Sequence, residues 1–242
     1  MPAPPRIRPA GDRALVVEYG VAIDPAINRS VRALGCLLNG LAHPGLVETV
    51  PTYRSLMVHY DPRRVSLSEL RRLIDEAHDR LDSVRLPPAK VVDIPTVYGG
   101  AYGPDLADVA AHHGLTPDEV VTIHAGSEYQ VYMMGFTPGF PYLGAVSPRI
   151  STPRLATPRT LVPAGSVGIA AQQTGIYPTA SPGGWRLLGR TPVRLFDLSR
   201  TPPVLFEAGD YVRFVPVDAD HYDVIQNAVE AGTFVPVVRP RE

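Results

Sequence analysis

A proline-rich segment, PRLATPR, carries two arginines that could bind an anion, Arg154 and Arg159. A guanidinium binds a carboxylate or phosphate through two parallel hydrogen bonds, and a backbone stiffened by proline lowers the entropic cost of aiming it. Two more arginines, Arg186 and Arg190, lie in SPGGWRLLGRTP beside the single tryptophan. We predict that these four arginines bind phosphate or carboxylate. The alternatives are a surface loop with solvated arginines and a strand that buries Trp185 while its arginines alternate outward.

Amide and hydroxyl side chains follow in the run QQTGIYP. Gln173, Thr174 and Tyr177 offer both donors and acceptors, so we predict that they hold a small amide. The preceding AGSVG superficially matches a nucleophile elbow around Ser166, but an elbow needs a strand before it and a helix after it. Pro163 and the β-forming residues after Ser166 favour a turn between strands. We therefore do not select Ser166 as a nucleophile.

The most unusual segment, GFTPGFPYLG, mixes large aromatics with residues that force sharp turns. We predict that it forms a site loop from Phe136, Gly139, Phe140, Pro141 and Tyr142. The competing interpretation is a tight core turn whose aromatics face inward.

The seven histidines are scattered, and neither an HExxH motif nor a pair of cysteines is present, so we predict no metal site. His124, four residues before Glu128, is the one histidine that we keep as a candidate site residue. The single cysteine, Cys36, cannot form an internal disulfide, and its place in a helical pattern predicts a buried apolar thiol.

Charge and composition exclude several classes of function. The formal net charge of -1 provides no bulk field for nucleic acid or an anionic membrane, so we expect neither as a partner. Lys90 is the single lysine and follows no glycine-rich turn, which excludes a Walker A phosphate loop and weakens Schiff-base or Ser-Ser-Lys amidase chemistry. No segment approaches the roughly 18 apolar residues of a membrane span, so we expect a cytoplasmic protein.

The elements that must position these residues fall into two halves. Residues 1–86 predict the order strand, helix, strand, strand, helix from their apolar spacing. If residues 91–97 supply a closing strand, the arrangement is ferredoxin-like βαββαβ, a fold that names no function. The expected strands cover 14–19, 47–51 and 55–60, and the expected helices cover 25–41 and about 66–81.

A second domain is predicted to begin at residue 87, where two prolines form a linker and the composition changes. Two helices come first and one comes last, with short β segments separated by glycine and proline between them, which argues for a barrel or sandwich. The expected helices cover 106–113, 117–125 and 218–231, and the expected strands cover 130–134, 161–162, 167–170, 185–190 and 211–215.

These segments, in this order, resemble the 5-oxoprolinase B-subunit family, also called allophanate hydrolase subunit 1 and KipI-like, which is related to the carboxyltransferase domain of urea carboxylase. Agreement covers most of residues 98–217 and appears in GFTPGFPYLG, PRLATPR, VPAGSVGIA, QTGIYP, SPGGWRLLGRTP and GDYVRFVP. The resemblance implies an α+β protein with a small ferredoxin-like domain over residues 1–86 and a cyclophilin-like β-barrel domain over residues 87–242.

The resemblance also implies a function. It is that of the B-type subunit of an ATP-dependent 5-oxoprolinase, which opens 5-oxoproline to L-glutamate together with C-type and A-type subunits. The complex consumes ATP, and the resemblance assigns neither the ATP site nor a nucleophile to any one subunit. Two other functions fit the same motifs: a KipI-like regulatory protein that inhibits a histidine kinase, and a carboxyltransferase or allophanate hydrolase-type subunit. A prolyl isomerase function is suggested only by the cyclophilin-like fold, and a shared fold is weak support for a shared function.

Overall fold

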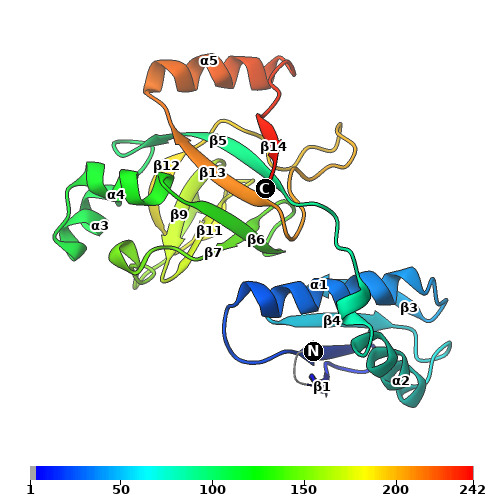
Figure 1. Ribbon diagram of the computed structural model, residues 1–242. Helices are drawn as coiled ribbons and strands as arrows, with labels where there is room; N and C mark the ends of the chain where they lie inside the picture. Colours follow the sequence, from blue (N-terminus) through cyan, green and yellow to red (C-terminus); the bar gives the residue numbers. More distant parts are fainter. Residues whose placement is uncertain (1–3, 242) are drawn as a thin grey trace. The chain divides into compact units, whose positions relative to one another are not determined.

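The computed structural model of the chain describes residues 4–241, which form two compact units, one ending at Pro88 and the other beginning at Ala89 (Figure 1). Each unit has its own hydrophobic core. Within the described residues, no helix is long and apolar enough to cross a bilayer.

The first unit is a four-stranded antiparallel sheet that packs against two helices, with fully buried Leu34, Leu56 and Ile74 in its core. Asp24 starts the first helix, because its carboxylate accepts a hydrogen bond from the backbone N–H of Ala26 at 2.6 Å. The strands are β1 (Arg6–Pro9), β2 (Ala14–Glu18), β3 (Leu46–Pro51) and β4 (Ser55–Tyr60), in the spatial order β1-β2-β4-β3, and the helices are α1 (Pro25–Gly40), α2 (Leu67–His78) and the 3-10 turn η1 (Leu81–Ser83).

The segment from residue 91 to 97 does not close this sheet, so that part of the prediction is wrong. It lies in β5 (Lys90–Tyr98), which pairs with strands of the second unit. The place beside β2 is taken by β1, which runs antiparallel to it from Arg6 to Pro9. A four-residue edge strand ending in proline gives little sequence signal, because proline is tolerated there and the alternation is too short to detect.

Cys36 is exposed on α1, which corrects the prediction of a buried thiol. Leu34 and Leu38, two positions before and after it, are fully buried. Two residues rotate a helix by about 200°, so the position between two core leucines faces the opposite side.

The second unit is a closed seven-stranded barrel in the order β12-β9-β10-β7-β6-β13-β5, with β5 returning to pair with β12. Its strands are β6 (Glu128–Met134), β7 (Pro141–Gly144), β9 (Ser166–Ala170), β10 (Gln173–Ile176), β12 (Arg186–Arg190) and β13 (Tyr211–Pro216), together with β5. The remaining elements are α3 (Leu106–His113), α4 (Pro117–Ala125), η2 (Pro148–Ile150), β8 (Arg159–Val162), β11 (Ser181–Gly183), α5 (Ala219–Glu230) and β14 (Val238–Pro240).

Strand β5 is the longest of the barrel, and its length lets it close the ring. It runs parallel to β13, as Figure 1 shows, while its first residues pair with β14 and its last two pair with β12. The molecule is thus α+β, with a small mixed unit followed by a barrel.

Side chains along the barrel strands alternate between the interior of the barrel and its outer face, so the unit has an inner core and an outer cluster. The inner core takes Leu143, Ile169 and Ile176, whereas the intervening positions Tyr142 and Ala170 belong to the outer cluster. Successive strand residues point to opposite faces, so this parity decides which side chains can reach a ligand outside the barrel.

A two-stranded ribbon made by β8 and β11 stands apart from the barrel sheet. Val162 of the ribbon packs in the outer cluster with Phe140, Tyr177 and Trp185. Beside this cluster, a cavity is lined by residues of the ribbon, the β6–β7 loop and the segment that leads into β12.

Candidate functional site

The cavity beside the outer cluster is the candidate functional site. It has a volume of about 240 Å³ and combines five aromatic side chains with one arginine. Its lining residues are Phe136, Phe140, Tyr142, Arg154, Pro158, Tyr177, Pro182, Gly183, Gly184 and Trp185. Five of the residues predicted from the sequence meet here: Phe136, Phe140, Tyr142, Arg154 and Tyr177.

The β6–β7 loop holds two phenylalanines in different environments. Its turn is closed by the backbone N–H of Phe140, which donates to the carbonyl of Thr137 at 3.0 Å. Gly139 has φ +83°, and a Cβ there would lie 2.8 Å from the Cβ of Phe196, so this position requires glycine. Phe140 is buried, as the core-turn alternative expects, but Phe136 is 61% exposed at the rim of the cavity.

Phe136 adopts φ +65°, a left-handed conformation that is costly for a bulky side chain. Such strain costs about 1–3 kcal/mol and is found where the surroundings over-determine the conformation, often at binding sites. The ring contacts Phe140 edge-on, with 5.5 Å between centroids. The loop therefore presents one aromatic ring to solvent at the mouth of the cavity.

The aromatic wall lies close to the barrel because the strand beneath it carries glycine. A Cβ at Gly175 would lie 3.0 Å from both the Phe140 and the Trp185 rings. Phe140 is nearly perpendicular to its two main neighbours, with centroids 5.3 Å from Tyr177 and 5.6 Å from Trp185. Edge-to-face contacts of this kind are favourable and fix the ring orientations.

Arg154 provides the positive charge of the site. Its guanidinium carbon lies 5.9 Å from the centroid of the Trp185 ring, within the range of a cation–π contact. No ion pair within residues 4–241 involves this exposed side chain. Burial raises the pKa of Tyr142 and of Tyr177, and the charge of Arg154 opposes both shifts.

Arg159 lies behind the cavity rather than in it. Its Nη2 donates to Oδ1 of the buried Asp105 at 2.6 Å, and Oδ2 of that carboxylate accepts the backbone N–H of Leu187 at 2.7 Å. The Nη1 of Arg159 also donates to the carbonyl of Trp185 at 3.5 Å. The ion pair thus ties the ribbon to the start of β12, whose neighbouring Trp185 lines the cavity.

Arg186 and Arg190 are engaged outside the cavity. Arg186 lies 3.8 Å from a carboxylate oxygen of Asp108 and donates to the carbonyl of Pro153 at 3.5 Å. Arg190 stacks over the ring of Tyr102, with its guanidinium carbon 5.6 Å from the centroid. Neither is a lining residue, so the geometry does not bring the four arginines together.

His124 and Thr174 lie inside the barrel, away from the cavity. Thr174 Oγ1 donates to the carbonyl of Gly168 at 3.0 Å, so it accepts from Nε2–H of His124 at 2.9 Å. Nδ1 of the histidine then accepts from the hydroxyl of Tyr98 at 2.8 Å. Burial lowers the pKa of His124 to about 3, so the ring is neutral at physiological pH.

Strand parity explains why Thr174 does not orient a ligand in the cavity. Thr174 and Ile176 face the barrel interior, so Gly175 faces the outer cluster. Gln173 shares the outward parity but is not a lining residue, and neither are Gly139 and Pro141.

Five lining residues were not selected by our sequence prediction: Pro158, Pro182, Gly183, Gly184 and Trp185. Trp185 is buried, as the core interpretation expects, yet it also forms part of the cavity wall. Their positions in the sequence could have indicated them, because they lie next to residues of the selected motifs. Pro158 directly precedes Arg159, and Gly183 and Gly184 directly precede the tryptophan.

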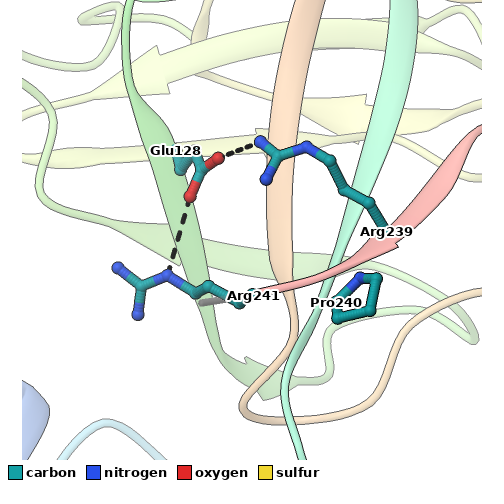
Figure 2. Close-up of a pocket in the computed structure, with 4 residues that line it drawn as sticks. All are labelled: Glu128, Arg239, Pro240 and Arg241. Atoms are coloured by element: carbon teal, nitrogen blue, oxygen red, sulfur yellow. Dashed lines mark hydrogen bonds and ion pairs between the residues drawn. The ribbon is translucent and has the colours of Figure 1, made fainter.

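A second cavity, of about 430 Å³, lies near the C-terminal strand β14 and is lined by Glu128, Arg239, Pro240 and Arg241. Figure 2 shows both arginines directed to the carboxylate of Glu128, which pairs with Arg239 and lies 3.6 Å from Nε of Arg241. Arg241 also stacks on Tyr211, 3.5 Å from the ring centroid. These contacts tie β14 to β6. Within residues 4–241, no group of three or more His, Cys, Asp or Glu side chains is placed to hold a metal ion.

Comparison with solved structures supports this architecture. The TTHA0988 crystal structure in space group P212121 matches with a TM-score of 0.75 and 41% identity, covering 86% of this chain and 40% of that chain. This chain therefore spans less than half of TTHA0988. The K. lactis urea amidolyase matches with a TM-score of 0.82 over 98% of this chain and 16% of that chain, but at 22% identity this likeness shows the fold alone.

Comparison of sequences identifies the family. Residues 5–206 match the family described as carboxyltransferase domain, subdomain C and D. The B subunit of 5-oxoprolinase from Bacillus subtilis (strain 168) is 41% identical over 227 residues, covering 90% of this chain and 95% of that protein. The B subunit of 5-oxoprolinase from Escherichia coli O157:H7 is 44% identical over 209 residues, covering 85% and 93%. The resemblance seen in the motifs is confirmed, and the chain belongs to the 5-oxoprolinase B-subunit family.

Proposed function

We propose that this chain is the B-type subunit of an ATP-dependent 5-oxoprolinase and acts with C-type and A-type subunits to open 5-oxoproline to L-glutamate. The observation that carries the proposal is 41% identity over 95% of the length of a curated 5-oxoprolinase B subunit. The match extends over almost the whole of both chains, so it spans the barrel unit that contains the cavity as well as the first unit.

The chemistry explains why such a reaction uses more than one subunit. A lactam carbonyl is a poor electrophile, and its opening by water needs activation of the carbonyl oxygen. Tyrosine hydroxyls and an arginine can bind and orient a substrate, but the candidate site contains no Ser, Cys or Lys that would act as a nucleophile. The role that the site supports is therefore binding and orientation.

ATP binding fits this chain poorly. The single lysine, Lys90, pairs with Asp210 at 3.4 Å on strand β5 and is not part of a glycine-rich phosphate loop. Arg159, Arg186 and Arg190 are held by protein groups. We therefore place the ATP site on one of the partner polypeptides and derive no step through ATP on this chain.

Partner polypeptides are also supported by the relatives. Both bacterial relatives described above are named as the B subunit of an enzyme, which indicates at least one other subunit in those proteins. In TTHA0988 the matching region makes up 40% of a longer chain. Fusion of a B-subunit-like region to another region in one chain is expected where the two regions act together.

The test is co-expression of this chain with C-type and A-type subunits, followed by measurement of glutamate release from 5-oxoproline with and without ATP. Copurification and ATP-dependent glutamate release are expected. A well-folded complex that releases no glutamate would contradict the proposal. The carboxyltransferase alternative, which the family description favours, would then be tested by carboxyl transfer to urea from a biotin-bearing partner.

A further inference from the structure

We infer that the aromatic cavity of the barrel is the binding site for the lactam, with the amide ring held among the aromatic side chains and its carboxylate held by Arg154. The inference rests on the proposed function and deepens it. It assigns the site to one outer face of the barrel and separates the residues that touch the ligand from those that only shape the wall.

The size and lining of the cavity select a small planar ligand. Its volume of about 240 Å³ is below the range of roughly 300–1,000 Å³ typical of sites for drug-sized molecules. Phe140 stands nearly perpendicular to Tyr177 and Trp185, so ring faces and ring edges border the same space. A flat five-membered ring can pack against a face on one side while it meets edges on another.

The charge at the rim selects an anion. Arg154 is exposed and has no ion-pair partner within the described part of the chain, and Trp185 supports its guanidinium at 5.9 Å. Arg159, by contrast, is paired with Asp105 at 2.6 Å. A guanidinium with its donors available binds a single carboxylate through two parallel hydrogen bonds, which matches the one carboxylate of 5-oxoproline.

The polar end of the cavity suits an amide. The hydroxyl of Tyr177 is protonated at neutral pH, and burial raises its pKa further. That oxygen accepts a hydrogen bond from the backbone N–H of Trp185, so its own proton remains a donor for the lactam carbonyl. A Cβ at Gly183 would lie 2.4 Å from the hydroxyl oxygen, so the glycine allows the hydroxyl to lie against the ribbon.

The single tryptophan makes binding directly measurable in the full chain. Trp185 is the only tryptophan in the sequence and lines the cavity, so its fluorescence should change on titration with 5-oxoproline and saturate. The ligand 2-pyrrolidinone, which has the lactam but no carboxylate, should bind at least about tenfold more weakly. L-Glutamate, which lacks the ring, tests whether a carboxylate alone is sufficient and should bind weakly.

Variants separate the two contacts. Arg154→Gln should weaken 5-oxoproline binding by about tenfold or more and leave 2-pyrrolidinone binding unchanged, because only the charged hydrogen bonds are lost. Tyr177→Phe should weaken both ligands severalfold. Arg71→Gln, an exposed arginine on α2 of the first unit, is the matched control and should bind like the wild type.

The same variants in the assembled complex make the outcome decisive. Arg154→Gln should raise KM for 5-oxoproline about tenfold with little change in kcat, since the arginine binds the substrate away from its reacting bond. Turnover by the complex with wild-type KM in Arg154→Gln, and no Trp185 response in the full chain, would overturn the binding site while leaving the proposed function standing. Saturable binding by a complex that shows no turnover would overturn the function and leave the site standing.

Discussion

Gly175 shows how a single residue sets the shape of the site. The position faces the outer cluster, and a Cβ built there lies 3.0 Å from the carbonyl of Pro141 as well as from two aromatic rings. The carbonyl belongs to strand β7, which is paired with β10 in the sheet. A side chain at position 175 would therefore displace the two aromatic rings rather than the backbone. The aromatic arrangement of the cavity therefore depends on the absence of a side chain at this position.

The substitution Gly175→Ala should accordingly distort the cavity and destabilise the barrel by about 1–3 kcal/mol, the usual cost of overpacking. Urea unfolding measures the stability, and Trp185 emission measures the change in the wall. Gly40→Ala at the end of α1 is the control, because a Cβ there meets nothing within 4 Å. Equal stability and emission for Gly175→Ala and the wild type would show that the rings are not confined by the strand.

His124 is a second residue whose environment makes a measurable prediction. Burial lowers its pKa from 6.5 to about 3, so below pH 6.5 the unfolded chain takes up a proton that the folded chain does not. The contribution is fully present above pH 6.5 and is lost progressively as the pH falls toward 3.

Replacement of His124 by glutamine removes the group that takes up this proton in the unfolded chain. Between pH 6.5 and about 4.5, the free energy of unfolding should fall less steeply in His124→Gln than in the wild type, by up to about 1.4 kcal/mol per pH unit. The measurement is urea unfolding at a series of pH values. The slope, rather than the absolute stability, is the relevant quantity, and identical slopes would contradict a neutral buried histidine.

At the scale of elements, the ribbon and the start of β12 form one wall because Asp105 joins them. Its backbone N–H donates to the carbonyl of Leu187 at 3.0 Å, its carboxylate accepts the N–H of the same residue, and Arg159 completes the set. The sequence predicts that Arg159 binds phosphate or carboxylate, and the structure shows its guanidinium paired with the carboxylate of Asp105.

Loss of the ion pair between Arg159 and Asp105 should lower the stability of the cavity wall. Arg159→Ala leaves the buried carboxylate of Asp105 without its cation and should cost about 2 kcal/mol of stability. Arg159→Lys should recover part of it. Arg186→Ala removes two longer and weaker contacts, at 3.5 and 3.8 Å, and should cost less than about 1 kcal/mol of stability. A fully stable Arg159→Ala in denaturant titrations would contradict this structural role.

The elements also show what the sequence could predict. The helices of both units and the strands β6, β9, β12 and β13 follow from apolar spacing and turn residues, and their bounds agree within a few residues. The pairing of β5 with β13 joins residues about 120 positions apart, and nothing in a local pattern encodes it. The inward position of Thr174 is not predictable for a related reason: the parity of a four-residue strand becomes visible only once its neighbouring strands are known.

At the scale of the whole molecule, the two units contribute differently to function. The cavity, the strained loop and Arg154 all lie in the barrel unit, within residues 136–185. The family match, in contrast, begins at residue 5 and includes the first unit. The barrel therefore holds the proposed substrate site, and the first unit is an integral part of the family's architecture.

The proposed role of the chain in 5-oxoproline hydrolysis is tested most directly by the rate of glutamate formation when the chain is added to a mixture of C-type and A-type subunits with ATP and 5-oxoproline. We expect negligible glutamate without the chain and a rate that rises and saturates as the chain is added. A rate that is unaffected by the chain, or a correctly assembled mixture that forms no glutamate, would contradict its assignment as the B-type component of the enzyme.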